Sequence, residues 1–126
     1  MAEHPNVTAV RSAIGAMNSG DMQAMAEGLA DDAVWHEIGN PNPVRGKAAL
    51  AERWSSGGMG DMEFSSSAHD VVGNDDHVVA LAETTVRRGD KSLSYRTAEI
   101  FHVKDGKITE RWAFSDDTAA IIDFFS

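Results

Sequence analysis

The spacing of hydrophobic residues changes part-way along this 126-residue sequence. As far as Trp54, most apolar residues recur every three or four positions, which is the spacing of a helix with one buried face. From Glu63 onward, apolar and polar residues alternate, which is the spacing of a β-strand. Helices that precede a run of strands predict an α+β domain whose helices cover one face of a sheet.

Three helices and a short strand are predicted before the main sheet. Each helix is bounded by residues that favour helix ends, a side-chain cap before it or a glycine after it. The predicted helices cover residues 7–17 (capped by Asn6 and ended by Gly20), 22–29 (capped by Asp21) and 46–54 (ended by Gly57 and Gly58), and the short strand covers residues 34–38.

The main sheet is predicted to be an antiparallel meander of four strands. Its turns contain Gly, Asn and Asp, which favour tight reversals of the chain. The predicted strands cover residues 63–72, 78–86, 93–103 and 108–114, and a final helix covers residues 118–125. A strongly bent sheet closed by helices encloses a cone, which is a common place for a small-molecule site.

Composition excludes several classes of function. The net charge of −9 and the scattered Lys and Arg residues disfavour nucleic acid and membrane as partners. The sequence contains no cysteine, which excludes disulfides and thiolate sites, and its histidines lack metal-binding spacing. Nucleotide, nicotinamide and serine-hydrolase motifs are not found, so we expect no cofactor and no metal. The N-terminus has no signal-peptide pattern and no segment approaches about 18 apolar residues, so we expect a cytoplasmic protein.

Alternation places acidic residues among aromatic ones on two predicted strands. Tyr95, Thr97, Glu99 and Phe101 share one face of strand 93–103. On the next strand, the residues predicted to share a face are Ile108, Glu110, Trp112, Phe114 and Asp116. Bulky residues between acids are typical of an apolar pocket with a polar mouth. Burial would raise a carboxyl pKa and suit it to acid–base chemistry near neutral pH, whereas the structural alternative pairs each Glu with an Arg.

Two further predictions concern residues 34–38 and 78–86. His36 is the only histidine bracketed by an aromatic residue, Trp35, and an acid, Glu37, within a predicted buried strand. Strand 78–86 is apolar on both faces, so one face would meet the helices and the other a partner subunit. We therefore expect a homodimer formed through the outer face of the sheet.

Several short motifs resemble one family. They are Ser19-Gly20-Asp21, the run 29–36, Val44-Arg45-Gly46, the run 103–108, Glu110-Arg111-Trp112, Asp116 and Asp123-Phe124-Phe125, and the resemblance covers nearly the whole chain. Their order is similar to that in the SnoaL-like branch of the nuclear transport factor 2-like superfamily, which also contains ketosteroid isomerases and limonene epoxide hydrolases. The resemblance implies a single domain, residues 1–126, with a cone-shaped curved antiparallel β-sheet packed on three N-terminal helices, the cystatin-like or ketosteroid isomerase-like α+β barrel.

The resemblance also implies roles for individual residues. Glu37 falls at the position of the general base of the isomerases, and Glu99 falls near their oxyanion-holding aspartate. Ala13 stands where those isomerases have an oxyanion-holding tyrosine. Asp116 resembles the acid–base aspartate of the SnoaL-like cyclases, and His36 could orient or shuttle a proton beside it.

Three hypotheses follow. The first is an enzyme that transfers a proton on a small, largely apolar cyclic carbonyl compound, by isomerase-like or cyclase-like acid–base catalysis without a cofactor. Its polar groups would be Glu37, Asp116, His36 and Glu99, and its binding surface would be Trp35, Tyr95, Phe101, Trp112 and Phe114. The second is a non-catalytic module of the same fold that holds a small apolar or aromatic ligand. The third is an epoxide hydrolase-like enzyme, although Tyr95 and Arg96 are predicted to lie on opposite faces of one strand.

Overall fold

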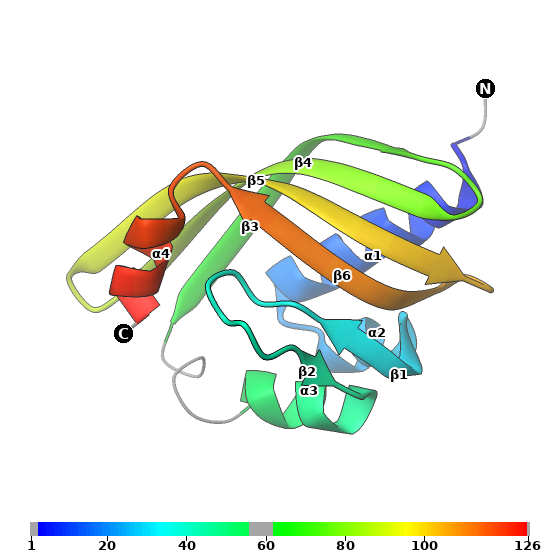
Figure 1. Cartoon of the computed structure of the whole chain (residues 1–126), viewed down its shortest axis with the longest axis horizontal. Helices are drawn as coiled ribbons and strands as arrows, with labels where there is room; N and C mark the ends of the chain where they lie inside the picture. Colours follow the sequence, from blue (N-terminus) through cyan, green and yellow to red (C-terminus); the bar gives the residue numbers. More distant parts are fainter. Residues whose placement is uncertain (1–2, 56–61, 126) are drawn as a thin grey trace.

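Apart from a two-residue strand at residues 44–45, the order of helices and strands is the one that the sequence predicts. The computed structural model describes residues 3–55 and 62–125 (Figure 1). The elements are α1 (Pro5–Ser19), α2 (Met22–Glu27), β1 (Leu29–Trp35), β2 (Val44–Arg45), α3 (Lys47–Ser55), β3 (Glu63–Gly73), β4 (His77–Arg88), β5 (Lys91–Lys104), β6 (Lys107–Ser115) and α4 (Thr118–Phe125). The predicted end of the third helix at residues 57–58 lies outside the described ranges. None of the helices in these ranges is long and apolar enough to cross a membrane.

The strands form one curved sheet in the order β2-β1-β6-β5-β4-β3 (Figure 1). Strands β3 to β6 are the antiparallel meander that the turn sequences predict. Strand β1 runs parallel to β6, because it joins the sheet from the helical half of the chain and not through a hairpin. The α+β cone that the resemblance implies is therefore confirmed, with a mixed sheet in place of a purely antiparallel one.

The first strand lies earlier in the chain than the sequence predicts. It covers Leu29–Trp35 and not residues 34–38, and α2 correspondingly ends at Glu27. The pairing of β1 with β6 is interrupted in its middle, which leaves Asp31 and Asp32 exposed. Two adjacent aspartates have low strand propensity, so residue preferences do not predict this irregular strand.

Helix ends follow capping chemistry. Gly20 ends α1 in the left-handed conformation, with φ 74°, as predicted. Asp21 caps α2, where its carboxylate accepts a backbone N–H of the first turn at 3.0 Å. Helix α1 begins at Pro5, two positions before the predicted start, because His4 and not Asn6 is its cap. The Nδ1 atom of His4 accepts the backbone N–H of Asn6 at 3.1 Å.

The helices cover one face of the sheet, which we call the inner face, and the opposite face is the outer face. Helix α1 lies behind β3 and β4 in Figure 1, and α3 packs against β1. Trp54 of α3 meets Trp35 of β1 edge-on, with ring centroids 5.3 Å apart, and Trp35 in turn meets Phe101 of β5 at 6.4 Å. The main core therefore lies between the helices and the inner face.

The C-terminal helix packs against the end of the sheet near the β4–β5 turn (Figure 1). Ile121 of α4 is buried in a second, smaller core with Tyr95 and Ile38. Gly39 has φ 81° and lies directly under α4, since a Cβ atom there would be 2.5 Å from Cγ1 of Ile122. Helix α4 thus joins the loop after β1 to the ends of the long strands.

Candidate functional site

An irregularity in the pairing of β5 with β6 decides which side chains of β6 face the helices. Val103 pairs with Ile108, and the next pair is His102 with Glu110. Thr109 is therefore an extra residue on β6 with no counterpart on β5. One extra residue of this kind is a β-bulge, and it turns every later side chain of the strand to the opposite face.

The bulge overturns one prediction. Ile108 is buried on the inner face, but the side chains of Glu110, Trp112 and Phe114 lie on the outer face, and that of Arg111 lies on the inner face. Strict alternation predicted that Ile108, Glu110, Trp112, Phe114 and Asp116 share one face, and this prediction is wrong. Trp112 and Phe114 consequently do not line the inside of the cone.

The inner face of β5 carries the row of side chains that alternation predicts. Tyr95, Thr97, Glu99 and Phe101 are all buried. Oε1 of Glu99 accepts hydrogen bonds from Nη2 of Arg111 at 2.7 Å and from its Nε at 3.1 Å. The two side chains are only 6% and 12% exposed. A carboxylate and a guanidinium are thus paired inside the cone.

Arg111 is held by two further contacts. Its Nη1 donates to the backbone carbonyl of His36 at 3.0 Å, and its guanidinium carbon lies 4.8 Å from the ring centroid of Trp35. A carboxylate, a carbonyl and an aromatic face together fix the guanidinium plane. Arg111 belongs to a motif that resembles the family, but it was not predicted to lie in the site. Only the bulge at Thr109 indicates that Arg111 faces inward, and the alternation of apolar and polar residues does not reveal that bulge.

Tyr95 lies at the end of the inner row. Burial raises its pKa above 10.0, the nearby Arg111 charge lowers that pKa to a smaller extent, and Glu99 raises it slightly further. The hydroxyl is therefore neutral near pH 7 and is a hydrogen-bond donor. It has no hydrogen-bond partner among the described residues. A neutral hydroxyl with no partner in the described ranges is available to a bound oxygen atom.

Glu37, the predicted general base, lies just beyond β1. Its Oε2 accepts from Nε of Arg53 at 3.1 Å, and its Oε1 accepts from Asn40 at 3.4 Å. The side chain of Glu37 is 21% exposed and that of Arg53 is 49% exposed. Arg53 belongs to α3, which packs against β1 on the inner face, so this pair lies on the same side of the sheet as Glu99.

His36 lies on the face opposite to Glu99. Its Nε2 is hydrogen-bonded to Oε2 of Glu110 at 2.8 Å, and its ring stacks on Trp112 with centroids 5.0 Å apart. His102 reaches the same group, with Nδ1 3.9 Å from Oε1 of Glu110 and its ring edge-on to Trp112 at 4.9 Å. We call His36, His102, Glu110 and Trp112 the outer cluster. The structure does not bring His36 together with Glu99.

Asp116 and Phe114 also lie outside the cone. Phe114 is 60% exposed. Oδ1 of Asp116 accepts from the backbone nitrogen of Arg96 at 3.0 Å, and the Asp116 N–H donates to the Arg96 carbonyl at 3.2 Å. Asp116 therefore extends the pairing of β5 with β6 by one residue. The predicted polar groups divide between the faces, with Glu99 and Glu37 on the inner side and His36 and Asp116 outside.

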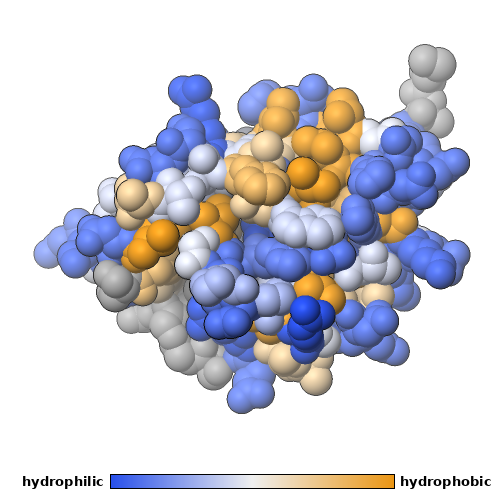
Figure 2. Space-filling model, viewed as in Figure 1, coloured by the Kyte–Doolittle hydropathy of each residue, from blue (hydrophilic) through white to orange (hydrophobic). Residues whose placement is uncertain are grey.

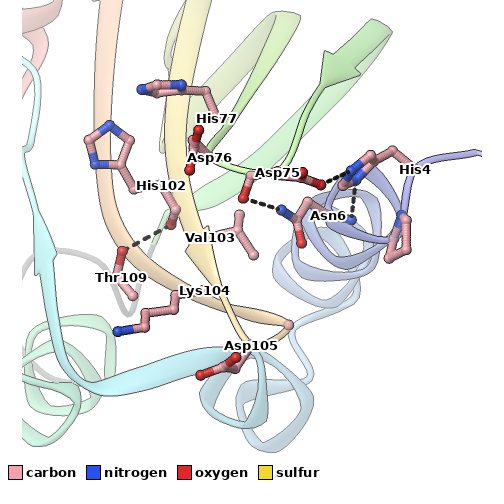
Figure 3. Close-up of a pocket in the computed structure, with 12 residues that line it drawn as sticks. His4, Asn6, Asp75, Asp76, His77, His102, Val103, Lys104, Asp105 and Thr109 are labelled. Atoms are coloured by element: carbon pink, nitrogen blue, oxygen red, sulfur yellow. Dashed lines mark hydrogen bonds and ion pairs between the residues drawn. The ribbon is translucent and has the colours of Figure 1, made fainter.

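Two cavities open elsewhere on the surface. The larger, of about 800 Å³, lies among the N-terminal residues, the β3–β4 turn and the β5–β6 turn, where His77 and His102 reach it (Figure 3). The smaller, of about 290 Å³, lies between α1 and β3. Neither is lined by Tyr95, Glu99 or Arg111. Within the part of the chain that the structure describes, no group of three or more His, Asp or Glu residues is arranged to hold a metal ion.

Comparison with known proteins assigns this arrangement to a family. The model of the SnoaL-like domain matches residues 10–111. The chain belongs to the SnoaL-like family. No curated protein matches its sequence.

Three solved structures share the fold of this SnoaL-like chain. Bal32a, from a soil-derived mobile gene cassette, is 26% identical, with 97% of each chain covered and a TM-score of 0.84. An LEH-like epoxide hydrolase of Mycobacterium tuberculosis is 23% identical over 89% of this chain and 83% of that chain, with a TM-score of 0.76. Delta 5-3-ketosteroid isomerase from Mycobacterium sp. is 22% identical over 87% of this chain and 92% of that chain, with a TM-score of 0.74.

Proposed function

We propose that this SnoaL-like chain binds a small, largely apolar cyclic molecule inside the cone and transfers a proton next to its carbonyl group without a cofactor. The observation that carries the proposal is the buried Glu99–Arg111 pair beside the neutral hydroxyl of Tyr95. A buried ion pair contributes little net stability, because desolvation of both charges offsets their attraction. Its place among aromatic side chains therefore favours a role in function.

Arg111 and Tyr95 are the proposed donors to the carbonyl oxygen of the ligand. Negative charge develops on that oxygen when a proton leaves the neighbouring carbon, and positioned donors stabilise it. Glu99 and His36 accept three of the five N–H groups of Arg111, which leaves two for a ligand. Glu99 is thus a positioning residue for Arg111. Trp35 and Phe101 supply the apolar walls.

Glu37 is the proposed base. Ion pairs with an exposed partner contribute about 0–1 kcal/mol, so the carboxylate can leave Arg53 for a substrate proton at little cost. Glu37 lies between His36, whose carbonyl binds Arg111, and Ile38, which packs in the same small core as Tyr95. Glu37 is therefore flanked in sequence by one residue that contacts Arg111 and one that packs in the core of Tyr95.

The names of two structural relatives support this class of chemistry. One is a ketosteroid isomerase and another an epoxide hydrolase, so the fold accommodates isomerisation and hydrolysis in other chains. Between these, the site favours proton transfer, since Arg96, the arginine considered for a hydrolase-like arrangement, lies on the outer face.

Hydrogen–deuterium exchange next to the carbonyl of a panel of cyclic ketones tests the proposal without knowledge of the product. Glu37→Gln should slow exchange at least about 100-fold, because it removes the base. Tyr95→Phe should slow it about 10-fold to 100-fold, because it removes one oxygen donor. The matched control Glu110→Gln removes a carboxylate from the outer face and should leave the rate unchanged. Equal exchange in wild type and Glu37→Gln would overturn the proposal.

A binding module without turnover is the second candidate. It is favoured by the observation that both acids on the inner side are paired with arginine. In that case Trp35→Ala should abolish binding of cyclic ketones or aromatic acids in calorimetry. Glu37→Gln should then leave affinity intact, and the wild-type chain should catalyse no exchange.

We also infer that the chain forms a homodimer through the outer face of the sheet. Val72, Leu81 and Phe114 are 54%, 38% and 60% exposed on this face. Figure 2 shows hydrophobic side chains gathered over β4, β5 and β6, with α1 behind the sheet in the same view. Contiguous exposed apolar surface of this kind marks interaction sites.

Sedimentation of a mutant pair tests the homodimer. Leu81→Glu places a charge in the middle of the apolar surface and should convert the dimer to a monomer. Met22→Glu makes the same kind of change at a residue of α2 that is 42% exposed, and it should leave the dimer intact. A wild-type chain that sediments as a monomer at micromolar concentration would overturn the inference.

A further inference from the structure

We infer that the ligand of the cone carries a hydroxyl group on the carbon next to its carbonyl, and that Oε2 of Glu99 accepts the hydrogen bond of this hydroxyl. The inference rests on the proposed function, in which Arg111 holds the carbonyl, and it adds the substrate class, a cyclic α-hydroxyketone. The two oxygen atoms of Glu99 are used unequally inside the cone, and this difference carries the inference.

The ion pair of Glu99 with Arg111 uses only one oxygen of the carboxylate. Nη2 and Nε of Arg111 both donate to Oε1, at 2.7 Å and 3.1 Å. A guanidinium and a carboxylate frequently form two parallel hydrogen bonds instead, one to each oxygen. Oε2 is therefore left outside the ion pair, although it belongs to a side chain that is only 6% exposed.

The partner of Oε2 among the described residues is a weak one. The hydroxyl of Thr97 lies 3.5 Å from Oε2, whereas a hydroxyl that donates to a carboxylate normally lies about 2.5–2.7 Å away. Beyond these contacts with Thr97 and Arg111, the Glu99 side chain has no hydrogen bond within the described ranges. A buried carboxylate oxygen without a good donor costs free energy, and a ligand hydroxyl supplies that donor.

Small side chains lie on both sides of Glu99. It pairs directly with Ala80 of β4 and with Ala113 of β6, and directly paired residues share a face of the sheet. Ala82, which pairs with Thr97, extends this group of small side chains along β4. Cross-strand neighbours therefore do not shield Oε2, and a ring can lie against the alanines beside it.

Arg111 and Glu99 present a donor and an acceptor side by side. Arg111 has two N–H groups that no described residue accepts, and Glu99 has the weakly bonded Oε2. A matching ligand has an acceptor and a donor side by side, which a carbonyl and a hydroxyl on neighbouring carbons provide. An ether oxygen in place of the hydroxyl would set its lone pairs against a carboxylate oxygen, so the site should reject it.

Calorimetry with 2-hydroxy-1-tetralone, 2-methoxy-1-tetralone and 1-tetralone tests this preference. The wild-type chain should bind the hydroxyketone at least about tenfold more tightly than the methoxyketone, because the ether cannot donate to Oε2. Glu99→Gln keeps a carbonyl oxygen for Arg111 and turns an amide NH₂ toward the ligand, so the ratio of the two affinities should fall to about one or below. Glu110→Gln makes the same substitution on the outer face, and it should leave the ratio unchanged.

A second variant shows which side chain holds the hydroxyl and leaves the ion pair intact. Thr97→Val removes the weak donor to Oε2 and should keep or increase the preference for the hydroxyketone. Loss of the preference in Thr97→Val would assign the hydroxyl to Thr97 and overturn the inference, as would a ratio that Glu99→Gln leaves unchanged. Equal affinity of the wild-type chain for all three ketones would overturn the inference but keep the proposed function, whereas binding of none of them would overturn both.

Discussion

The two faces of the sheet differ in how deeply they bury their ionisable side chains, although the residues of both faces alternate along the same strands. On the inner face, Glu99 and Arg111 are 6% and 12% exposed and lie against Trp35. On the outer face, His36 and Glu110 are 31% and 30% exposed and lie against Trp112. Each face thus has an acid, a basic group and a tryptophan. Access to water, and not composition, distinguishes the interior pair from the surface pair.

Deletion of Thr109 should exchange the two faces of β6 and have the largest effect. Arg111 would turn outward and Trp112 inward, which would leave Glu99 buried without its partner. The loss of stability should exceed about 5 kcal/mol, which is comparable to the whole stability of a small domain, so circular dichroism should show an unfolded chain. Thr109→Ala keeps the extra residue and should cost only about 1 kcal/mol. A folded deletion variant would refute the role given to the bulge.

Removal of one carboxylate from each face should lower the free energy of unfolding by less than the deletion does, and by clearly different amounts on the two faces. Glu99→Ala leaves Arg111 charged and buried, so it should lower the free energy of unfolding in urea by about 3–5 kcal/mol. Glu110→Ala breaks a half-exposed contact and should cost less than about 1 kcal/mol. Equal losses would show that the faces do not differ as described.

A double replacement separates the stability of the inner pair from its function. Glu99→Leu/Arg111→Met substitutes apolar side chains for both charges and should recover most of the stability that Glu99→Ala loses. It should nevertheless fail to bind cyclic ketones, because the oxygen donor is gone. Retained binding in a stable double variant would exclude Arg111 from the ligand site.

The smallest expected effect concerns the ionisation of Tyr95. Burial raises its pKa above 10.0, so the folded chain holds the proton more tightly than the unfolded chain does. The resulting stability is fully present below pH about 10 and is lost as pH rises from there through the folded pKa. Tyr95 is the only tyrosine, so near-ultraviolet absorbance reports its titration directly. The midpoint should lie above 10 in the folded chain and near 10 in urea, and Tyr95→Phe should lose less stability at alkaline pH. A folded midpoint at or below 10 would contradict the burial effect.

Sequence patterns predicted the fold where the register is regular. The buried row of Tyr95, Glu99 and Phe101 follows from alternation, because β5 pairs with β4 without interruption along its length. The final helix was predicted with the bounds that the structure shows, since a capping aspartate and a dense apolar face mark it. The period of the sequence therefore predicts side-chain orientation correctly wherever each residue of a strand pairs with one residue of the neighbouring strand.

Two features of the sheet were not predicted, and the physical reason is the same for both. A single inserted residue at Thr109 reversed the predicted orientation of Trp112 and Arg111, and an interrupted pairing around Asp31 hid the first strand. Bulges are set by contacts between strands that are distant in sequence, so the local pattern of one strand does not reveal them. The inner acid was thus predictable, but the arginine that holds it was not.

Residues 29–35 leave the ribosome well before residues 107–115, which form the long strand beside which they lie. Until β6 emerges, β1 and the aromatic surface of Trp35 have no sheet edge to join. Pairing between such distant segments is slow and leaves apolar surface uncovered in the meantime. A chain that stops before Lys107 should therefore be a substrate for chaperones and proteases, and not a smaller stable domain.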